Sequence, residues 1–195
     1  SDLKVEPGRK VLFLDMAEVQ SVDGLVESFH PMKKPPANPL LRTGPAGSWD
    51  AQRAHAYGDV IFDGKKFQMW YSGWSRPDGP LLPGTAGHHV GYAESEDGIH
   101  WVKPSLGQLA VNGSKDNNIV DLGEGKGHAY MPMVVRDTRE SDPARRYKMI
   151  VEQRGRNTLH FSPDGIRWSD GIVVRQDRWS DQRSFFYDTL ETDPR

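Results

Sequence analysis

The chain has 195 residues, a formal net charge of −2 and no cysteine. A near-neutral chain lacks the basic stripe that nucleic-acid binding requires, and a chain without cysteine has no disulfide framework. No apolar run approaches the length of about 18 residues that indicates a membrane span. We therefore expect no nucleic-acid partner and no membrane partner. Aromatic residues and glycine are plentiful and helical periodicity is almost absent, so the composition favours an all-β fold.

Residues 1–48 precede any recognisable repeat. Apolar runs at 10–15 and 25–29 predict short strands, and we interpret 1–48 as an N-terminal lead-in with strands that close a larger array of sheets. Proline and glycine recur between Pro31 and Pro45, which predicts an extended segment there rather than a helix or strand.

Strand signals follow one another from His55 to Trp101. Runs of β-branched and aromatic residues are separated by Asp63-Gly64 and followed by Asp97-Gly98. Asp-Gly between two such runs is typical of a two-residue hairpin turn of type I′. The stretch predicts four antiparallel strands in a row.

Three parts of this stretch recur about 70 residues later. The repeats are His55-Ala56-Tyr57 with His128-Ala129-Tyr130, residues 66–71 with 146–151, and residues 95–101 with 162–168. Each copy fits one four-stranded antiparallel blade with apolar residues on both faces, and such units stack around an axis in a β-propeller. We therefore predict an all-β propeller of which this chain covers two to three blades.

The expected boundaries are blade one at 49–122, blade two at 123–176 and the start of blade three at 177–195. Propellers have at least about four blades. We therefore expect a single, partial propeller domain that is completed by further chain or by a homo-oligomer.

The Asp-Gly turns belong to one edge of the predicted sheets. Strands alternate in direction, so Asp63-Gly64, Asp97-Gly98 and Asp164-Gly165 share an edge, and the other candidate residues lie towards the opposite one. The repeated Ser-x-Asp-Gly-Ile-x-Trp segment resembles the Asp-box of sialidase-like propellers, whose role is structural. Its turn chemistry favours the same role here.

Asp59 is the leading catalytic candidate. It lies in an inner strand, where the second repeat has Pro132, and a carboxylate in an apolar strand must be paired, solvated or used. The alternative is a structural ion pair with Arg154 or Arg183.

Two further carboxylates lie towards the same edge. Asp181 precedes the strand predicted at 183–188, and Glu152 ends the second strand of blade two. Either is a candidate for the second catalytic carboxyl group, and for either the alternative is an ordinary turn or capping role.

The candidate sugar-binding side chains are aromatic, imidazole and guanidinium groups near this edge. They are Trp49, His55, Trp74, His128, Arg154 and Arg183. Tryptophans in loops offer ring faces for stacking on sugars, and histidines are equally suited to buried structural roles. The histidines show no metal-ligand spacing, so we predict neither a metal nor a cofactor.

Segments 56–71, 91–104 and 142–149 resemble bacterial proteins of the five-bladed β-propeller glycosidase superfamily. Its best-known members are invertase-type and arabinanase-type hydrolases, and the similarity covers nearly the whole chain. The resemblance implies a catalytic aspartate near the start of an inner strand of the first blade, which Asp59 matches by position. The sequence lacks the Asn-Asp-Pro-Asn-Gly, Arg-Asp-Pro and Glu-Cys boxes of invertases, so the general acid is unassigned.

The resemblance implies a furanosidase-like glycoside hydrolase that acts on a polysaccharide or oligosaccharide through two carboxyl groups, with Asp59 as nucleophile or base. We also expect a secreted or periplasmic protein from which any signal peptide has been removed. One alternative is a non-catalytic carbohydrate-binding propeller. The other is a glycoside phosphorylase, in which phosphate held by arginines replaces the attacking water.

Overall fold

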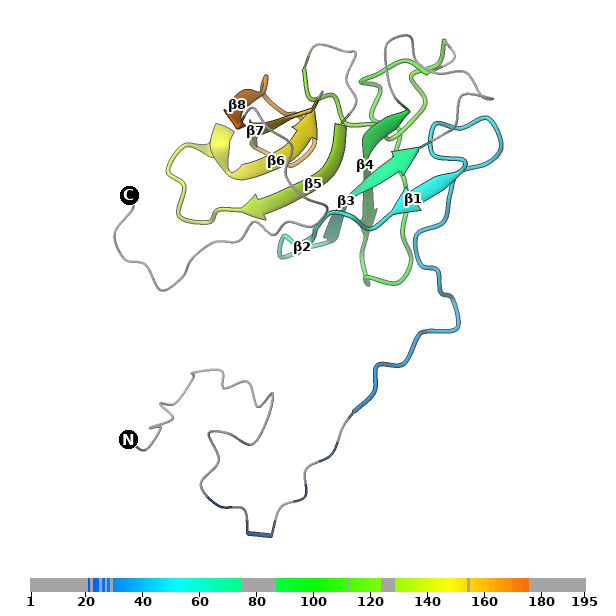
Figure 1. Cartoon of the computed structure of the whole chain (residues 1–195), viewed down its shortest axis with the longest axis vertical. Helices are drawn as coiled ribbons and strands as arrows, with labels where there is room; N and C mark the ends of the chain where they lie inside the picture. The colour runs from blue at the N-terminus through cyan, green and yellow to red at the C-terminus, as the bar shows by residue number, and fades with distance from the viewer. Residues whose placement is uncertain are drawn as a thin grey trace. The chain divides into compact units, whose positions relative to one another are not determined.

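The computed structural model describes residues 21, 23–24, 26, 28, 30–74, 87–111, 113–123, 129–153 and 155–175. The chain divides into two units, 1–35 and 36–195. The second unit contains two antiparallel four-stranded sheets (Figure 1). Among the described residues there is no α-helix, and the one 3-10 helix is η1 (Pro143–Arg145). The prediction of an all-β fold is confirmed.

The described residues of the first unit form no helix or strand. The strand predicted at 10–15 lies outside the described residues. Of the strand predicted at 25–29, only Val26 and Ser28 are described, and neither is in a strand. The proline-rich segment 31–45 contains turns and bends but no strand, as its composition predicts.

The first sheet consists of β1 (Arg53–His55), β2 (Val60–Phe62), β3 (Phe67–Trp74) and β4 (His88–Ser95). Both β1 and β2 pair with β3, so they are two halves of the inner strand that the sequence predicts as continuous. The fourth predicted strand does not form. Instead, Val102 and Ile119 make isolated bridges to the outer side of β4.

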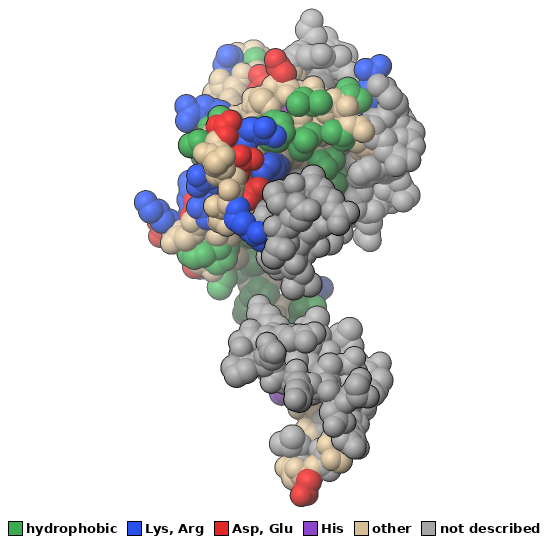
Figure 2. Space-filling view, turned by 90° about the vertical axis from the view of Figure 1, so that its left-hand side faces the viewer, with side chains coloured by type: hydrophobic (Ala, Val, Ile, Leu, Met, Phe, Trp, Pro, Cys, Tyr) green, Lys and Arg blue, Asp and Glu red, His purple; other side chains and the backbone are tan. Residues whose placement is uncertain are grey.

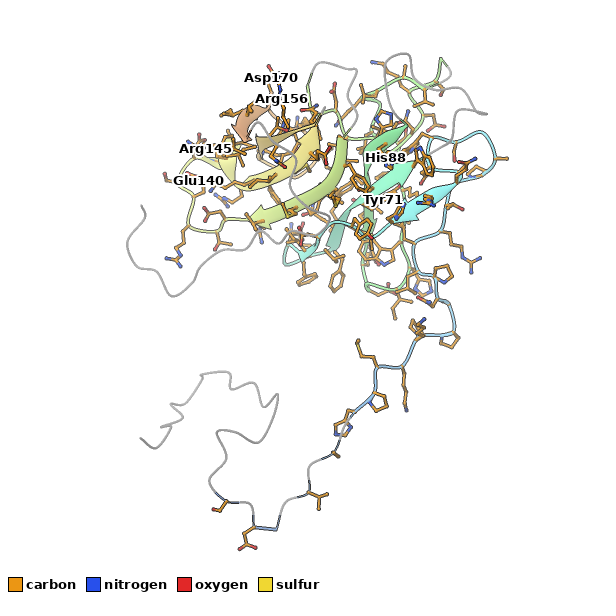
Figure 3. The ribbon with its side chains drawn as sticks, viewed as in Figure 1. Tyr71, His88, Glu140, Arg145, Arg156 and Asp170 are labelled. Atoms are coloured by element: carbon orange, nitrogen blue, oxygen red, sulfur yellow. The ribbon has the colours of Figure 1, made fainter. Side chains whose placement is uncertain are left out.

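The second sheet consists of β5 (Ala129–Arg136), β6 (Tyr147–Gln153), β7 (Arg156–Ser162) and β8 (Ile172–Arg175), paired in that order. The connection from β5 to β6 contains η1, and Figure 3 labels Glu140 and Arg145 within it. The ammonium group of Lys148 on β6 pairs with Asp137 and with Glu140, the latter at 3.0 Å. These ion pairs hold the long connection against the sheet.

The first hairpin differs from the predicted two-residue turn. Phe62 pairs with Phe67, so four residues, 63–66, connect the strands. Gly64 has a φ of +103°, whereas Asp63 does not have a positive φ. The Asp63 carboxylate accepts the backbone N–H groups of Lys65 and Lys66, so a side chain closes this turn.

The two Asp-Gly-Ile-x-Trp turns have matching hydrogen bonds. Asp97 Oδ1 accepts the N–H groups of residues 99 and 100, and Asp164 Oδ1 accepts those of residues 166 and 167. In each turn the indole N–H of the tryptophan donates to the glycine carbonyl. Hydrogen bonds from His100 lower the pKa of Asp97. Both aspartates therefore build turns, which agrees with the predicted structural role.

The two sheets pack against each other through a shared core around Trp70, which is fully buried. Its partners on this interface are Val90 and Tyr92 from the first sheet and Val134, Tyr147, Met149 and Val151 from the second. The Trp70 indole donates to the carbonyl of Gly165 at 2.7 Å. A Cβ at Gly165 would lie 2.5 Å from the Trp70 ring, so only glycine fits this contact. The close fit of Trp70 against Gly165 and the hydrogen bond between them therefore fix how the two sheets pack.

Trp49 lies in the core on the other face of the first sheet. Only 6% of its surface is exposed, it stacks on Tyr71, and its indole N–H donates to Asn118 at 2.9 Å. Asp50, 2% exposed, accepts the Tyr71 hydroxyl at 2.9 Å and pairs with Lys103. Burial leaves no free face of the Trp49 ring, so its predicted role in sugar stacking is replaced by a role in packing.

Candidate functional site

The pairing of the first strand in each sheet is irregular at equivalent positions of the two repeats. In the first sheet, residues 56–59 lie opposite only two residues of β3, because His55 pairs with Ser72 and Val60 with Met69. In the second sheet, the register between β5 and β6 shifts between Tyr130 and Met133. These irregularities fall where the two sequence repeats align Asp59 with Pro132. Each sheet therefore has a bulge at this position of its first strand.

Particular backbone features produce the two bulges. A Cβ at Gly58 would lie 1.9 Å from the carbonyl oxygen of Trp70, so this close approach requires glycine. In β5, Met131 adopts a φ of +56°, and its N–H donates to Ser72 Oγ at 3.0 Å. A non-glycine residue at positive φ is uncommon, and here a hydrogen bond from the first sheet holds it.

The bulge in the first sheet directs Asp59 towards the second sheet. Asp59 Oδ2 accepts the backbone N–H of Val134 on β5 at 2.6 Å. Burial raises the pKa of Asp59, and the hydrogen bond from Val134 partly offsets this rise. Asp59 forms no ion pair with any Lys or Arg that the structure describes. The group is therefore a half-buried carboxyl that holds its proton to a higher pH than an ordinary aspartate.

The raised pKa predicts how Asp59 affects stability. Because the folded pKa lies above the unfolded value near 3.8, Asp59 favours folding below that pH and loses this contribution as pH rises through the folded pKa. We expect D59N to have a higher free energy of unfolding than the wild type at pH 7. The expected difference is about 1.4 kcal/mol for each unit by which the folded pKa of Asp59 exceeds its unfolded pKa. The difference should shrink towards pH 4.5 in urea titrations. A D59N variant that is less stable than the wild type at pH 7 would contradict the burial of an ionised group.

Five rings form a continuous series at the end of β3 opposite its turn, and one of them, Tyr57, lies in the same bulge as Asp59. We call this series the aromatic row, and its members in order of contact are His55, Tyr57, Tyr130, His88 and Trp74. The ring centroids of successive members lie 5.4, 6.1, 4.7 and 5.3 Å apart. The Arg53 guanidinium lies 5.0 Å from the centroid of Trp74 at the end of the row.

The row combines exposed ring surface with polar groups. Tyr57 is 43% exposed, and the other four rings are partly exposed. Burial, together with the charge of Arg53, lowers the pKa of His55, so its ring is neutral near pH 7. His55 Nε2 is shielded from solvent and has no hydrogen-bond partner among the described residues. Ring faces with polar edges are suited to carbohydrate, which has apolar faces and hydroxyl edges.

The structure brings only part of the predicted site together. Asp59, His55 and Trp74 all lie on the face of the first sheet that is turned towards the second. Glu152 is paired with Tyr130 across β5 and β6, which places it on the same sheet face as that ring. The remaining predicted residues, His128, Arg154, Asp181 and Arg183, lie outside the described residues.

Three members of the aromatic row, Tyr57, His88 and Tyr130, are not among the residues predicted for the site. His88 comes from the start of β4, directly opposite Trp74, and is labelled in Figure 3. Tyr130 belongs to the repeated His-Ala-Tyr triplet, and its ring contacts both His88 and Tyr57. The repeated triplet could have identified Tyr130 as a candidate site residue from the sequence. No local signal identified His88, because its neighbours come from β3 and β5.

Within the described ranges, no group of three or more His, Cys, Asp or Glu side chains is arranged to hold a metal ion. The same part of the chain has no helix of the length and apolarity that crossing a bilayer demands.

No protein-family model matches the chain. Two proteins of Mycobacterium tuberculosis are similar to it: "Uncharacterized protein Rv1502" of strain H37Rv and "Uncharacterized protein MT1551" of strain CDC 1551. Each is 32% identical to the chain over 135 residues, which cover 64% of the chain. The match covers 38% of each relative, so the chain spans less than two fifths of their length. This distant similarity is the relationship that the comparisons support, and it assigns no family.

Proposed function

We propose that the two sheets are neighbouring blades of a β-propeller. Their antiparallel order and their packing around Trp70 support this arrangement. Both outward faces also carry exposed apolar side chains. Val60 and Phe62 on the first sheet are each 52% exposed, and Ile172 on the second is 57% exposed. Figure 2 shows hydrophobic side chains beside charged ones on the face that it presents. Further blades would bury such faces.

The function that best fits this arrangement is that of a glycoside hydrolase. The observation that carries the proposal is the Asp59 carboxyl group, which has a raised pKa and lies in the bulge that also holds Tyr57 of the aromatic row. A raised pKa suits a group that takes up and releases a proton during the reaction, as a general base that activates water does. The resemblance to the five-bladed propeller glycosidases gives the same position to a catalytic aspartate.

In this proposal Asp59 acts together with a second carboxyl group. Hydrolysis requires two carboxyl groups, at about 5 to 5.5 Å for retention and about 6.5 to 9.5 Å for inversion. Glu152, across from Tyr130, is the described candidate, and Asp181 is the candidate outside the described residues. Tyr57, which is 43% exposed, would contact a sugar ring.

An activity screen tests the proposal. The protein is incubated with arabinan, fructan and a panel of pyranose oligosaccharides, and new reducing ends are measured with and without phosphate. A hydrolase releases sugar in buffer without phosphate. Sugar phosphate that forms only with added phosphate would replace the proposal with a phosphorylase. Saturable binding without product would replace it with a carbohydrate-binding propeller.

A further inference from the structure

A second feature lies at the opposite end of β3 from the aromatic row. Here the turn 63–66 of the first sheet meets the turn after β7 and the adjoining ends of β5 and β6 of the second. These segments enclose a pocket of about 400 Å³ at the seam between the sheets. The lining side chains with formal charge are Asp63, Lys65, Lys66, Arg136, Arg146 and Asp164. Both sheets contribute, so the pocket depends on the way they pack.

Two arginines in this pocket have unused donors. The Nε atoms of Arg136 and Arg146 are buried and have no hydrogen-bond partner within the described part of the chain. Arg136 Nη1 donates to the carbonyl oxygen of Asp63 at 3.0 Å. The Arg146 guanidinium makes no side-chain hydrogen bond or ion pair with another described residue. Buried donors are normally satisfied, so these N–H groups fit an acceptor that the chain does not supply.

The charges around the pocket favour an anion. Four of its ten lining residues are Lys or Arg and two are Asp. Lys66 pairs with Glu94 outside the pocket lining, so Lys65, Arg136 and Arg146 face the two carboxylates. Both carboxylates already have partners, since Asp63 accepts two backbone N–H groups and Asp164 pairs with Arg167. They therefore compete weakly for the free donors of Arg136 and Arg146.

We propose that this pocket binds a tetrahedral oxyanion, a sulfate or phosphate group. Guanidinium groups present planar pairs of N–H donors that match two oxygens of such an anion. Arg136 ends β5, and Arg146 directly precedes β6 in the same sheet. The anion is either free in solution or an ester on a saccharide. The pocket is separate from Asp59 and does not require the glycosidase activity.

The test is an NMR titration of the ¹⁵N-labelled full chain with sodium sulfate, sodium phosphate, galactose 6-sulfate or galactose, at constant ionic strength. We expect saturable shifts of backbone amides at 63–66, 136, 146 and 164–166 with the three anions and none with galactose. Tighter binding of galactose 6-sulfate than of inorganic sulfate would assign the anion to a sulfated saccharide. Equal affinity would assign it to the free ion.

Arginine variants locate the binding. R146Q should weaken sulfate binding at least tenfold, and R146K, which keeps the charge but loses the fork of donors, should fall between R146Q and the wild type. R156Q, at an exposed arginine on β7, is the matched control and should bind as the wild type does. Amide shifts of the wild type that rise linearly with sulfate concentration, or that spread over the whole surface, would overturn the proposal. A sulfate affinity of R146Q equal to that of the wild type would also overturn it.

Discussion

Replacing Asp59 by Asn is expected to reduce turnover of a glycoside substrate by about 10²- to 10⁴-fold, the usual contribution of a positioned acid or base. The amide has nearly the same shape, and its oxygen still accepts the Val134 N–H, so the bulge is preserved. Sugar binding should be nearly unchanged, because the aromatic row is intact. The measurement is kcat and KM on the substrate found in the screen, together with sugar affinity by calorimetry.

The matched control is D116N, at an exposed aspartate whose side chain makes no hydrogen bond with a described residue. Its turnover should equal that of the wild type. If D59N retains more than a tenth of the wild-type turnover, Asp59 is not the proton-transfer group, and the hydrogen bond to Val134 would be its whole role.

Trp70→Ala is expected to have the largest effect on stability. Removing a fully buried tryptophan typically costs about 3 to 5 kcal/mol, and whole domains have only about 5 to 15 kcal/mol of stability. The change would also remove the bond to Gly165 and the contacts of Trp70 with Tyr147 and Trp168 of the second sheet. Urea unfolding followed by circular dichroism should show this loss.

Two other variants separate the causes. Trp70→Phe keeps most of the apolar area but cannot donate to Gly165, so its loss should be smaller than that of Trp70→Ala. Trp168→Ala removes a ring that is only partly buried, so it should also cost less. If Trp70→Ala unfolds within about 1 kcal/mol of the wild type, the two sheets do not depend on this interface.

Local sequence signals identified the features that depend on neighbouring residues. The repeated triplet at 55–57 and the repeated Asp-Gly-Ile-x-Trp turns indicated two related sheets, because turn chemistry is set within a few residues. Asp59 was found by comparing repeats, since a carboxyl opposite Pro132 is unusual in an inner strand. The structure places Asp59 in a bulge with a raised pKa.

Features that depend on distant partners could not be read from the sequence. Trp49 resembles a loop tryptophan until Asn118, 69 residues away, accepts its indole N–H. The inner strand of the first sheet divides into β1 and β2 because the carbonyl of Trp70 approaches Gly58, a contact between strands. His88 joins the aromatic row only because β4 pairs it with Trp74. Tertiary contacts decide these positions, and local propensity does not.

A crystal structure of D59N with a bound oligosaccharide that the wild type cleaves tests the proposed catalytic role of Asp59 most directly. We expect a sugar ring against Tyr57, with the anomeric carbon, or a water beside it, about 3 to 3.5 Å from the side chain at position 59. Sugar bound away from the aromatic row, or a position 59 side chain still closed against Val134 with neither the anomeric carbon nor such a water within reach, would contradict a catalytic role for this site.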